Sequence, residues 1–352
     1  MTASHILTFA QLPDAGGVER AQGRLVHGWA AAGRRVTLVL GRSGGYDPVP
    51  GVEVVELGDA GFLALRALGA ITRERAPDVV FCPGNHYTSM ALLLRVRLGA
   101  GCPPIVAKMS NAPTRGDHGR VVGALHAAWL RSHGRFLDHL VAMTPGTATV
   151  AERALGMPGR VSVIPNPPTG RGRGAAAPPP LPPGRFILGV GRLAAQKRWD
   201  RLIQAVPRLA DARVSLVILG EGGERTRLEA LARALGVADR VHLPGHLDDP
   251  WPVMARAAVL ALASDFEGVP GVLREALSVG TPVVATDASP AVREIVCEPS
   301  LGTVVARGDA VALVAALDRW LVHSTARPAP VPQPGADAVA RYLDLFDRLV
   351  RA

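Results

Sequence analysis

The stretch DFEGVPGVLREALSVGTPVVATD, residues 265–287, decides the fold of this chain. Its glycines and Pro270 disfavour regular structure in the opening loop, because glycine loosens the backbone and proline lacks a backbone donor. Helix-forming residues then continue as far as Val279, where a glycine and a proline supply the stop. Residues 257–263 and 281–286 are apolar runs of strand length. The segment therefore predicts a strand, a loop, a helix and a second strand.

The predicted loop lies at the carboxyl end of a strand, which is where ligands bind in an open parallel sheet. The free N–H groups at the start of the helix favour an anion there. Two carboxylates flank the turn, Glu267 in the loop and Glu275 in the helix. At about 100° per residue, Glu275 lies on the side away from Leu273 and Leu277. A lone glutamate in either place is typically a solvated surface residue, so the meaning of the pair depends on its surroundings.

Residues 267–287 closely resemble the signature of the family 4 retaining glycosyltransferases. The resemblance implies the GT-B fold, an α/β architecture in which two Rossmann-like domains face each other across a cleft. It also implies that Glu267 approaches the hydroxyls of the donor sugar as a catalytic residue and that Glu275 holds the nucleotide ribose. The donor-binding positions between these two glutamates are Gly268, Val269, Pro270 and Gly271.

A basic loop follows the predicted strand 186–190. Arg192 offers a planar fork of donors and Lys197 a point charge, a suitable pair for a diphosphate, although basic loop residues are usually just solvated. Their spacing resembles the diphosphate grip of the family, which implies that both act with Glu267 in catalysis. Other turns resemble the family's donor contacts, and these positions are Gly16, Gly17, Gly220, Gly245 and His246.

The chain alternates strands and helices, which predicts right-handed crossovers and parallel sheets. We expect an N-terminal acceptor-side domain at 1–168, a stiff proline-rich linker at 169–184 and a C-terminal donor-nucleotide-binding domain at 185–335. The segment 336–352 is amphipathic. Because the last helix of the family often crosses back onto the first domain, this segment is a candidate to do the same.

The composition, 48% hydrophobic and 20% charged, describes a globular protein, and no apolar run approaches the roughly 18 residues of a membrane span. The N-terminus lacks the basic and apolar regions of a signal peptide. The three cysteines are scattered and odd in number, which indicates a reducing compartment without structural disulfides. We therefore expect a cytoplasmic protein.

The net charge of +9 is uneven, since residues 1–168 carry 17 Lys and Arg against 11 Asp and Glu. Such a surplus suits an anionic membrane lipid, a phosphorylated acceptor or nucleic acid. No helix-turn-helix, zinc-finger spacing or aromatic-rich RNA motif accompanies it, so nucleic acid is disfavoured as a partner. Residues 115–140 combine basic and apolar residues at helical spacing. This segment is either an amphipathic helix packed on its own sheet or a cationic helix at the inner face of the cell membrane.

Candidates for the acceptor side lie in the first domain, in or near loops that follow predicted strands. They are His86, Asn111 and His118, and each of the two histidines is more often an ordinary surface or core histidine than a site residue. Many members of the family carry a histidine directly after the strand that corresponds to 105–108. This chain has Ser110 there, so a different polar side chain would have to fill that role.

The resemblance implies transfer of a sugar from a UDP- or GDP-sugar to an acceptor with retention of the anomeric configuration. The acceptor would be a glycan or lipid-linked glycan of the cell envelope. No Asp-x-Asp motif is present to hold a metal, so we expect a metal-independent reaction without a cofactor. Two alternatives stay open. One is another GT-B activity, such as a sugar-nucleotide epimerase or a phosphorylase, and the other is a non-catalytic binder of nucleotide sugars.

Overall fold

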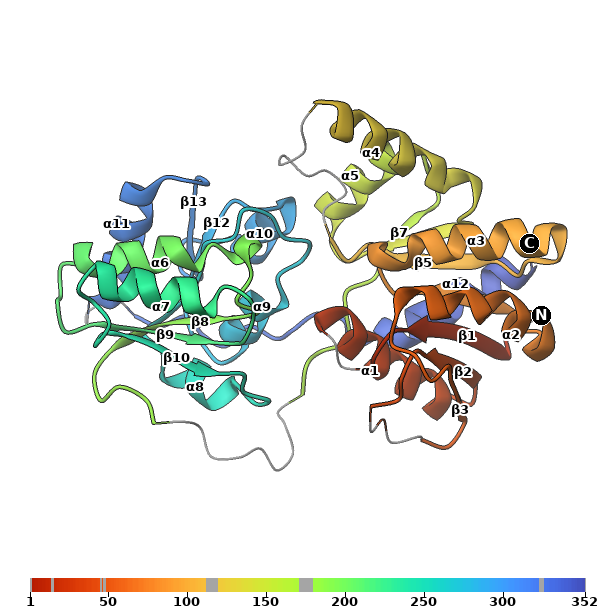
Figure 1. Ribbon diagram of the computed structural model, residues 1–352, viewed down its shortest axis with the longest axis horizontal. Helices are drawn as coiled ribbons and strands as arrows, with labels where there is room; N and C mark the ends of the chain where they lie inside the picture. Colours follow the sequence, from red (N-terminus) through yellow and green to blue (C-terminus); the bar gives the residue numbers. More distant parts are fainter. Residues whose placement is uncertain are drawn as a thin grey trace. The chain divides into compact units, whose positions relative to one another are not determined.

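The computed structural model describes residues 2–13, 16–44, 46, 49–111, 120–170, 180–322 and 326–351. The chain forms two compact units (Figure 1). Unit 1 combines Met1–Pro168 with Pro334–Ala352, and unit 2 is Thr169–Gln333. Within the described residues, no helix is both long enough and apolar enough to cross a membrane.

Unit 1 is built on a parallel sheet of seven strands in the order β3-β2-β1-β4-β5-β6-β7. The strands are β1 (His5–Ala10), β2 (Arg35–Leu40), β3 (Val52–Glu56), β4 (Val79–Cys82), β5 (Ile105–Lys108), β6 (His139–Ala142) and β7 (Val161–Val163). Helices cover both faces of the sheet, so its central strands β1, β4 and β5 are buried along their whole length. The strand order reverses between β1 and β4, and crevices for ligands form at the carboxyl ends of strands beside such a point.

The helices of unit 1 include one from the C-terminal end of the chain. They are α1 (Gly17–Ala31), α2 (Leu68–Arg75), α3 (Thr88–Leu98), α4 (Arg120–Ser132), α5 (Pro145–Leu155) and α12 (Ala338–Arg351), with short 3-10 turns η1 (Phe62–Ala67), η2 (Asn85–Tyr87), η3 (Gly99–Gly101) and η4 (His133–Arg135). Helix α12 packs on α1, where the ring of Trp29 lies 5.9 Å from Tyr342 and 5.3 Å from Phe346. Arg34 and Asp347 add an ion pair of 3.0 Å to this contact.

Helix α4 is shorter than the helical pattern of residues 115–140 suggests. It ends at Ser132, and the turn η4 follows. Phe136 and Leu137, which continue the pattern in sequence, lie instead in a turn that buries both side chains in the core. The apolar periodicity of the sequence therefore extends beyond the end of α4, because the residues that follow the helix also pack into the core.

Unit 2 has a parallel sheet of six strands in the order β10-β9-β8-β11-β12-β13. The strands are β8 (Phe186–Val190), β9 (Ser215–Leu219), β10 (Val241–Gly245), β11 (Val259–Leu262), β12 (Val283–Thr286) and β13 (Gly302–Val305). The connecting helices are α6 (Trp199–Ala205), α7 (Arg225–Ala234), α8 (Trp251–Arg256), α9 (Gly271–Ser278), α10 (Pro290–Ile295) and α11 (Ala310–Leu321), with turns η5 (Ala195–Lys197) and η6 (Val206–Arg208). The strand, loop, helix and strand predicted around residues 265–287 are β11, a loop, α9 and β12. The predicted fold class, α/β with two Rossmann-like sheets, is confirmed.

Candidate functional site

The loops after β8 and β11 in unit 2 are held together as one structure. The two strands pair side by side, with Leu260 in register with Leu188, so both loops leave the same edge of the sheet. The backbone N–H of Asp265 donates to the carbonyl of Gln196 at 3.0 Å, and the Gln196 side chain donates to the Phe266 carbonyl at 2.6 Å. The Asp265 carboxylate also accepts an ion pair of 2.6 Å from Arg201. The basic loop and the Glu267 loop are thus positioned relative to each other before any ligand arrives.

Glu267 lies at the centre of this structure, and its side chain is buried, with the residue 6% exposed. One carboxylate oxygen, Oε1, lies 2.6 Å from the Lys197 ammonium and accepts a hydrogen bond of 2.6 Å from the Ser264 hydroxyl. Thr286 on β12 donates to the Ser264 carbonyl at 2.6 Å and so fixes the backbone that carries this hydroxyl. A buried carboxylate needs such partners, because desolvation of an unpaired charge is costly. The structure therefore brings together two residues that the sequence assigned to one site.

Ser264 itself was missed by sequence reasoning. It is fully buried and is the second residue after β11, three residues before Glu267. The available signal was its position, since a serine at the carboxyl end of a buried apolar strand is well placed to support a side chain in the loop beyond.

Arg192 is the second cation of the basic loop, and it is exposed. Its carbonyl accepts a hydrogen bond of 2.9 Å from the indole of Trp199, which is buried at the start of α6. Within the residues that the structure describes, the Arg192 guanidinium has no hydrogen bond or ion pair. Its five N–H donors are therefore available to an anion.

Glu275 lies on α9, and its side chain is half-buried. Its Oε1 accepts a hydrogen bond of 3.2 Å from the Thr169 hydroxyl. A Cβ placed on Gly271 would lie 3.8 Å from the same oxygen, so the carboxylate reaches back toward the first turn of the helix. The Gly268 carbonyl in the preceding loop accepts a hydrogen bond of 2.8 Å from Ser289. The paired glutamates thus border one turn, whose residues Val269 and Pro270 lie between them.

The glycine turns after β9 and β10 lie at the same edge of the sheet. Gly220 has a φ of +154°, and a Cβ there would overlap the carbonyl oxygen of Gly191, so this close approach of two loops requires glycine. The Gly220 N–H donates to the Gly245 carbonyl at 2.8 Å. His246 follows as an exposed residue, with its Nε2 3.3 Å from Asp248. The predicted donor-binding positions of unit 2 therefore come from four loops at one sheet edge.

In unit 1, Gly16 and Gly17 begin α1. Gly16 is the N-cap residue, and its φ of −178° is extended backbone that any residue can adopt. A Cβ on Gly17 would meet no atom within 4 Å, so packing within the protein does not require glycine at that position. The predicted approach of a donor phosphate to this turn stays a prediction.

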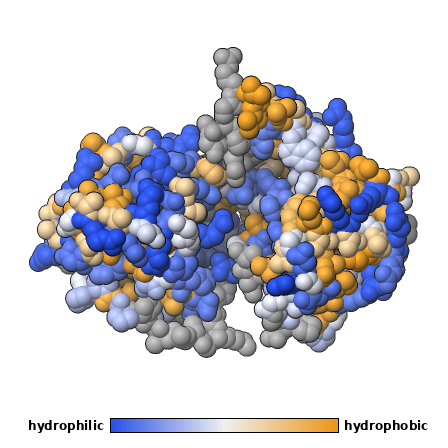
Figure 2. Space-filling view, viewed as in Figure 1, coloured by the Kyte–Doolittle hydropathy of each residue, from blue (hydrophilic) through white to orange (hydrophobic). Residues whose placement is uncertain are grey.

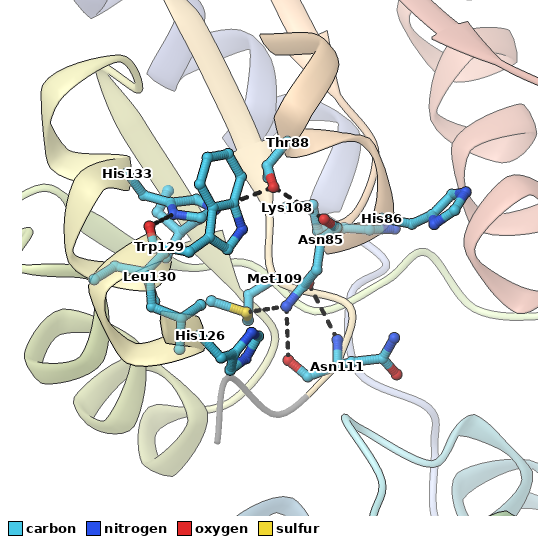
Figure 3. Close-up of a pocket in the computed structure, with 12 residues that line it drawn as sticks. Asn85, His86, Thr88, Lys108, Met109, Asn111, His126, Trp129, Leu130 and His133 are labelled. Carbon is cyan, nitrogen blue, oxygen red and sulfur yellow. Dashed lines mark hydrogen bonds between the residues drawn. The ribbon is translucent and has the colours of Figure 1, made fainter. Parts of the chain in front are cut away.

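The loops after β4 and β5 are joined by Asn85, another residue that sequence reasoning missed. Its Oδ1 accepts from the Ser110 N–H at 2.7 Å. Its Nδ2 donates to the Asn111 carbonyl at 3.2 Å (Figure 3). His86 next to it contacts Gln11 through Nε2 at 3.1 Å. Asn85, His86 and Asn111 all line one cavity of about 260 Å³ beneath α4 (Figure 3). The predicted acceptor-side residues His86 and Asn111 therefore share a pocket, whereas His118 lies outside the described residues.

Two family models match the chain. Residues 16–167 match the glycosyl transferase 4-like domain, and residues 178–329 match glycosyl transferases group 1. The lipopolysaccharide core biosynthesis glycosyltransferase LpsE of Rhizobium meliloti is 38% identical over 164 residues, 44% of this chain and 46% of that protein. LpsD of the same organism is 28% identical over 95% of both chains. A diphospho-undecaprenol N-acetylgalactosaminyltransferase of Campylobacter jejuni is 40% identical over 34% of this chain and 33% of its own length. The chain thus spans less than half of LpsE and of the Campylobacter enzyme.

Solved structures share the fold over the whole chain. HepE of Anabaena in complex with UDP-glucose aligns with a TM-score of 0.73 at 19% identity, covering 99% of this chain and 98% of that one. WaaG, a glycosyltransferase involved in lipopolysaccharide biosynthesis, aligns with a TM-score of 0.70 at 20% identity over 98% and 97% of the two chains. The two family models confirm the predicted family, and the solved structures confirm the fold. The chain belongs to the group 1 glycosyl transferases, family 4, and has the GT-B fold.

Proposed function

We propose that this protein transfers a sugar from a UDP-sugar to a glycan or lipid-linked glycan of the cell envelope, with retention of the anomeric configuration. The observation that carries the proposal is the buried contact of Glu267 with Lys197 at the edge of the unit 2 sheet, in a loop that also carries Arg192, a cation without a partner among the described residues. A pair of cations next to one oriented carboxylate suits a substrate that joins a sugar to a diphosphate.

The leaving group of this reaction is a nucleoside diphosphate, which gains negative charge as the glycosidic bond breaks. Lys197 uses one of its three N–H donors on Glu267, and the others can reach a phosphate oxygen. Arg192 adds a second cation, and the first turn of α9 adds free N–H groups. Because these groups are in place before the reaction, they stabilise the developing charge without reorganisation. The reaction would therefore proceed without a metal ion.

Glu267 acts in this proposal as an orienting group. Ser264 and Lys197 both contact its Oε1, which leaves Oε2 available to accept a hydrogen bond from a hydroxyl of the donor sugar. Glu275, which neighbours the same turn, would accept hydrogen bonds from the ribose. Carboxylates held in this way position the sugar over the reacting bond and supply specificity for its hydroxyls.

Two comparisons support the choice of donor and acceptor. HepE, which shares the fold, is described in complex with UDP-glucose, and LpsE and LpsD act in lipopolysaccharide core biosynthesis. We extend these properties to this chain as part of the proposal.

The test is to incubate the protein with radiolabelled UDP- and GDP-sugars and to measure hydrolysis with and without EDTA. We expect slow hydrolysis of one UDP-sugar, insensitive to EDTA, that Glu267→Gln abolishes. Glu298→Gln is the matched control, because Glu298 is an exposed glutamate of the same unit outside the site. Binding without hydrolysis in the presence of any glycan acceptor would favour a non-catalytic binder. Activity that EDTA removes and manganese restores would contradict the metal-independent mechanism.

We also propose that α4 rests on an anionic membrane surface. Val121, Val122 and Leu125 on this helix are 74%, 54% and 67% exposed, and hydrophobic atoms gather over α4 at the top of Figure 2. The helix contains Arg131 and no acidic residue. Apolar side chains beside basic ones are the pattern of a helix that lies in the membrane interface.

Sedimentation with liposomes tests this surface. We expect the wild-type protein to sediment with liposomes that contain anionic lipid at low salt. The double variant Val121→Asp/Leu125→Asp should stay in the supernatant. Val311→Asp on α11 is the control, because Val311 is 69% exposed in unit 2. Equal recovery of the protein on neutral and anionic liposomes would contradict the proposed membrane-binding surface.

A further inference from the structure

The cavity beneath α4 has two kinds of wall (Figure 3). Leu130, Leu140 and Leu155 form an apolar side, and Asn111 and His126 are polar residues of the lining. Its volume of about 260 Å³ is just below the roughly 300–1,000 Å³ of most small-molecule sites, so it has room for one compact ring. The nucleotide sugar does not account for this cavity, because the groups that the reaction proposed above assigns to the donor all lie in unit 2.

Trp129 of α4 presents an indole to this cavity, and the packing behind the ring fixes its orientation. The ring stacks on Phe136 at 5.8 Å with an interplanar angle of 27°. His133 packs against it at 4.8 Å and is itself held by the Trp129 carbonyl at 2.9 Å and the Thr88 hydroxyl at 3.0 Å. The indole therefore offers a rigid flat surface at little entropic cost to a ligand.

Among the residues that the structure describes, the polar edge of the same indole lacks a partner. Trp129 is only partly buried, and its N–H makes no hydrogen bond to any residue that the structure describes. In Figure 3 the indole nitrogen lies on the side that faces Asn85 across the cavity. Asn85 is fully engaged, since its amide bridges the loops after β4 and β5. The cavity thus combines a flat apolar surface, an available donor and a wall kept rigid by hydrogen bonds.

We propose that this cavity is a sugar subsite for the acceptor, in which one pyranose ring lies against the indole of Trp129. A pyranose has a face of C–H groups and a rim of hydroxyls, which match the indole face and the polar side of the cavity. An acyl chain would leave the indole N–H and the side-chain amide of Asn111 without suitable partners, because it offers no hydrogen-bonding group. The inference rests on the proposed function, since it assigns the acceptor of that reaction to the class of glycans and assigns Trp129 a role in its specificity.

The test measures binding of simple pyranosides to the full chain by saturation-transfer difference NMR. The probes are methyl α-glucopyranoside, methyl α-galactopyranoside and methyl α-glucuronide at millimolar concentration, with decanoate as the apolar probe. We expect at least one pyranoside to bind the wild type, and Trp129→Ala to weaken it about tenfold or more. Trp129→Phe keeps a ring but loses the N–H, and we expect a smaller loss of about threefold. Trp251→Phe is the matched control, because Trp251 is a partly buried tryptophan of unit 2.

UDP binding, measured in the same samples, separates this inference from the proposed function. UDP that binds while no pyranoside does would overturn the sugar subsite and leave the donor assignment intact. Equal pyranoside affinity in wild type and Trp129→Phe would place the sugar elsewhere, and this variant decides the matter if the alanine variant does not fold. If only decanoate binds and Trp129→Ala abolishes this binding, the cavity is a site for an acyl chain and the proposed sugar subsite is wrong. Pyranoside binding without any nucleotide binding would contradict the proposed function and not the subsite.

Discussion

Replacement of Lys197 by methionine removes the one cation that, among the described residues, contacts the buried Glu267 carboxylate. Methionine keeps much of the length and apolar stem of lysine, so the change isolates the charge. Breaking a buried ion pair on one side typically costs about 3–5 kcal/mol, because the remaining charge stays desolvated. The Lys197 side chain is 17% exposed, and Ser264 still donates to Glu267, so we expect a smaller loss of about 2–3 kcal/mol. For a unit of this size, that is a fall in melting temperature of roughly 4–12 °C.

Two further variants make this prediction specific. Glu267→Gln in the Lys197→Met background removes the stranded charge, so the double variant should be more stable than Lys197→Met alone. Arg213→Met removes an ion pair with Asp211 in which the arginine side chain is 90% exposed, and we expect no measurable change in melting temperature. Differential scanning calorimetry of the four proteins gives the comparison. If Lys197→Met melts at the wild-type temperature, or if the double variant is the less stable one, the reasoning about the buried carboxylate is wrong.

Three other changes test neighbouring parts of the structure. Ser264→Ala should destabilise unit 2 by about 1 kcal/mol and reduce hydrolysis of the UDP-sugar, because Glu267 loses the hydrogen bond from the Ser264 hydroxyl. Wild-type stability and wild-type hydrolysis would refute the supporting role of Ser264. Glu275→Ala should weaken UDP-sugar binding by about 1–3 kcal/mol in calorimetric titration, whereas unchanged affinity would count against its contact with the donor. Burial lowers the pKa of Lys108 from 10.5 to about 8, so the unfolded chain binds the extra proton between these values and stability should rise with pH there. Relative to Lys108→Met, the wild type should gain roughly 2 kcal/mol from pH 8 to pH 10 in chemical denaturation, and parallel curves for the two proteins would contradict this.

The donor-side residues could be predicted from the sequence because they lie close together in the chain. Glu267, Glu275 and the intervening turn lie within a single stretch, and the strand before it and the strand after it are plain apolar runs. The side-by-side position of Lys197 and Glu267 also follows from the fold, since β8 and β11 are neighbours in the sheet. Local periodicity therefore placed these residues on their loop and helix, and the resemblance to the glycosyltransferase family supplied their roles.

The same reasoning could not find Asn85, Ser264 or Trp129. Asn85 matters because it joins two loops that are 25 residues apart in the chain, and no local pattern records which strand lies beside β4. Trp129 fits the apolar periodicity of α4, which does not distinguish it from its neighbours. Only the packing of Phe136 and His133 behind the ring distinguishes a fixed surface of the cavity from an ordinary core residue. Such properties depend on contacts between elements, which a single sequence does not display.

The positions of the lysines in this chain give an independent argument about Lys108 and Lys197. Of the 39 basic residues, only Lys108 and Lys197 are lysines, so arginine is the default cation. An exposed cation can be either residue, but a buried cation with one oxygen partner leaves more donors unused as a rigid five-donor guanidinium than as a three-donor ammonium, and only the ammonium readily loses its proton. Lys108 is 1% exposed and has Asn166 as a partner at 3.2 Å, and Lys197 fits against Glu267 at 2.6 Å. Both lysines therefore occupy places where a compact ammonium fits and a planar fork would leave buried donors unpaired.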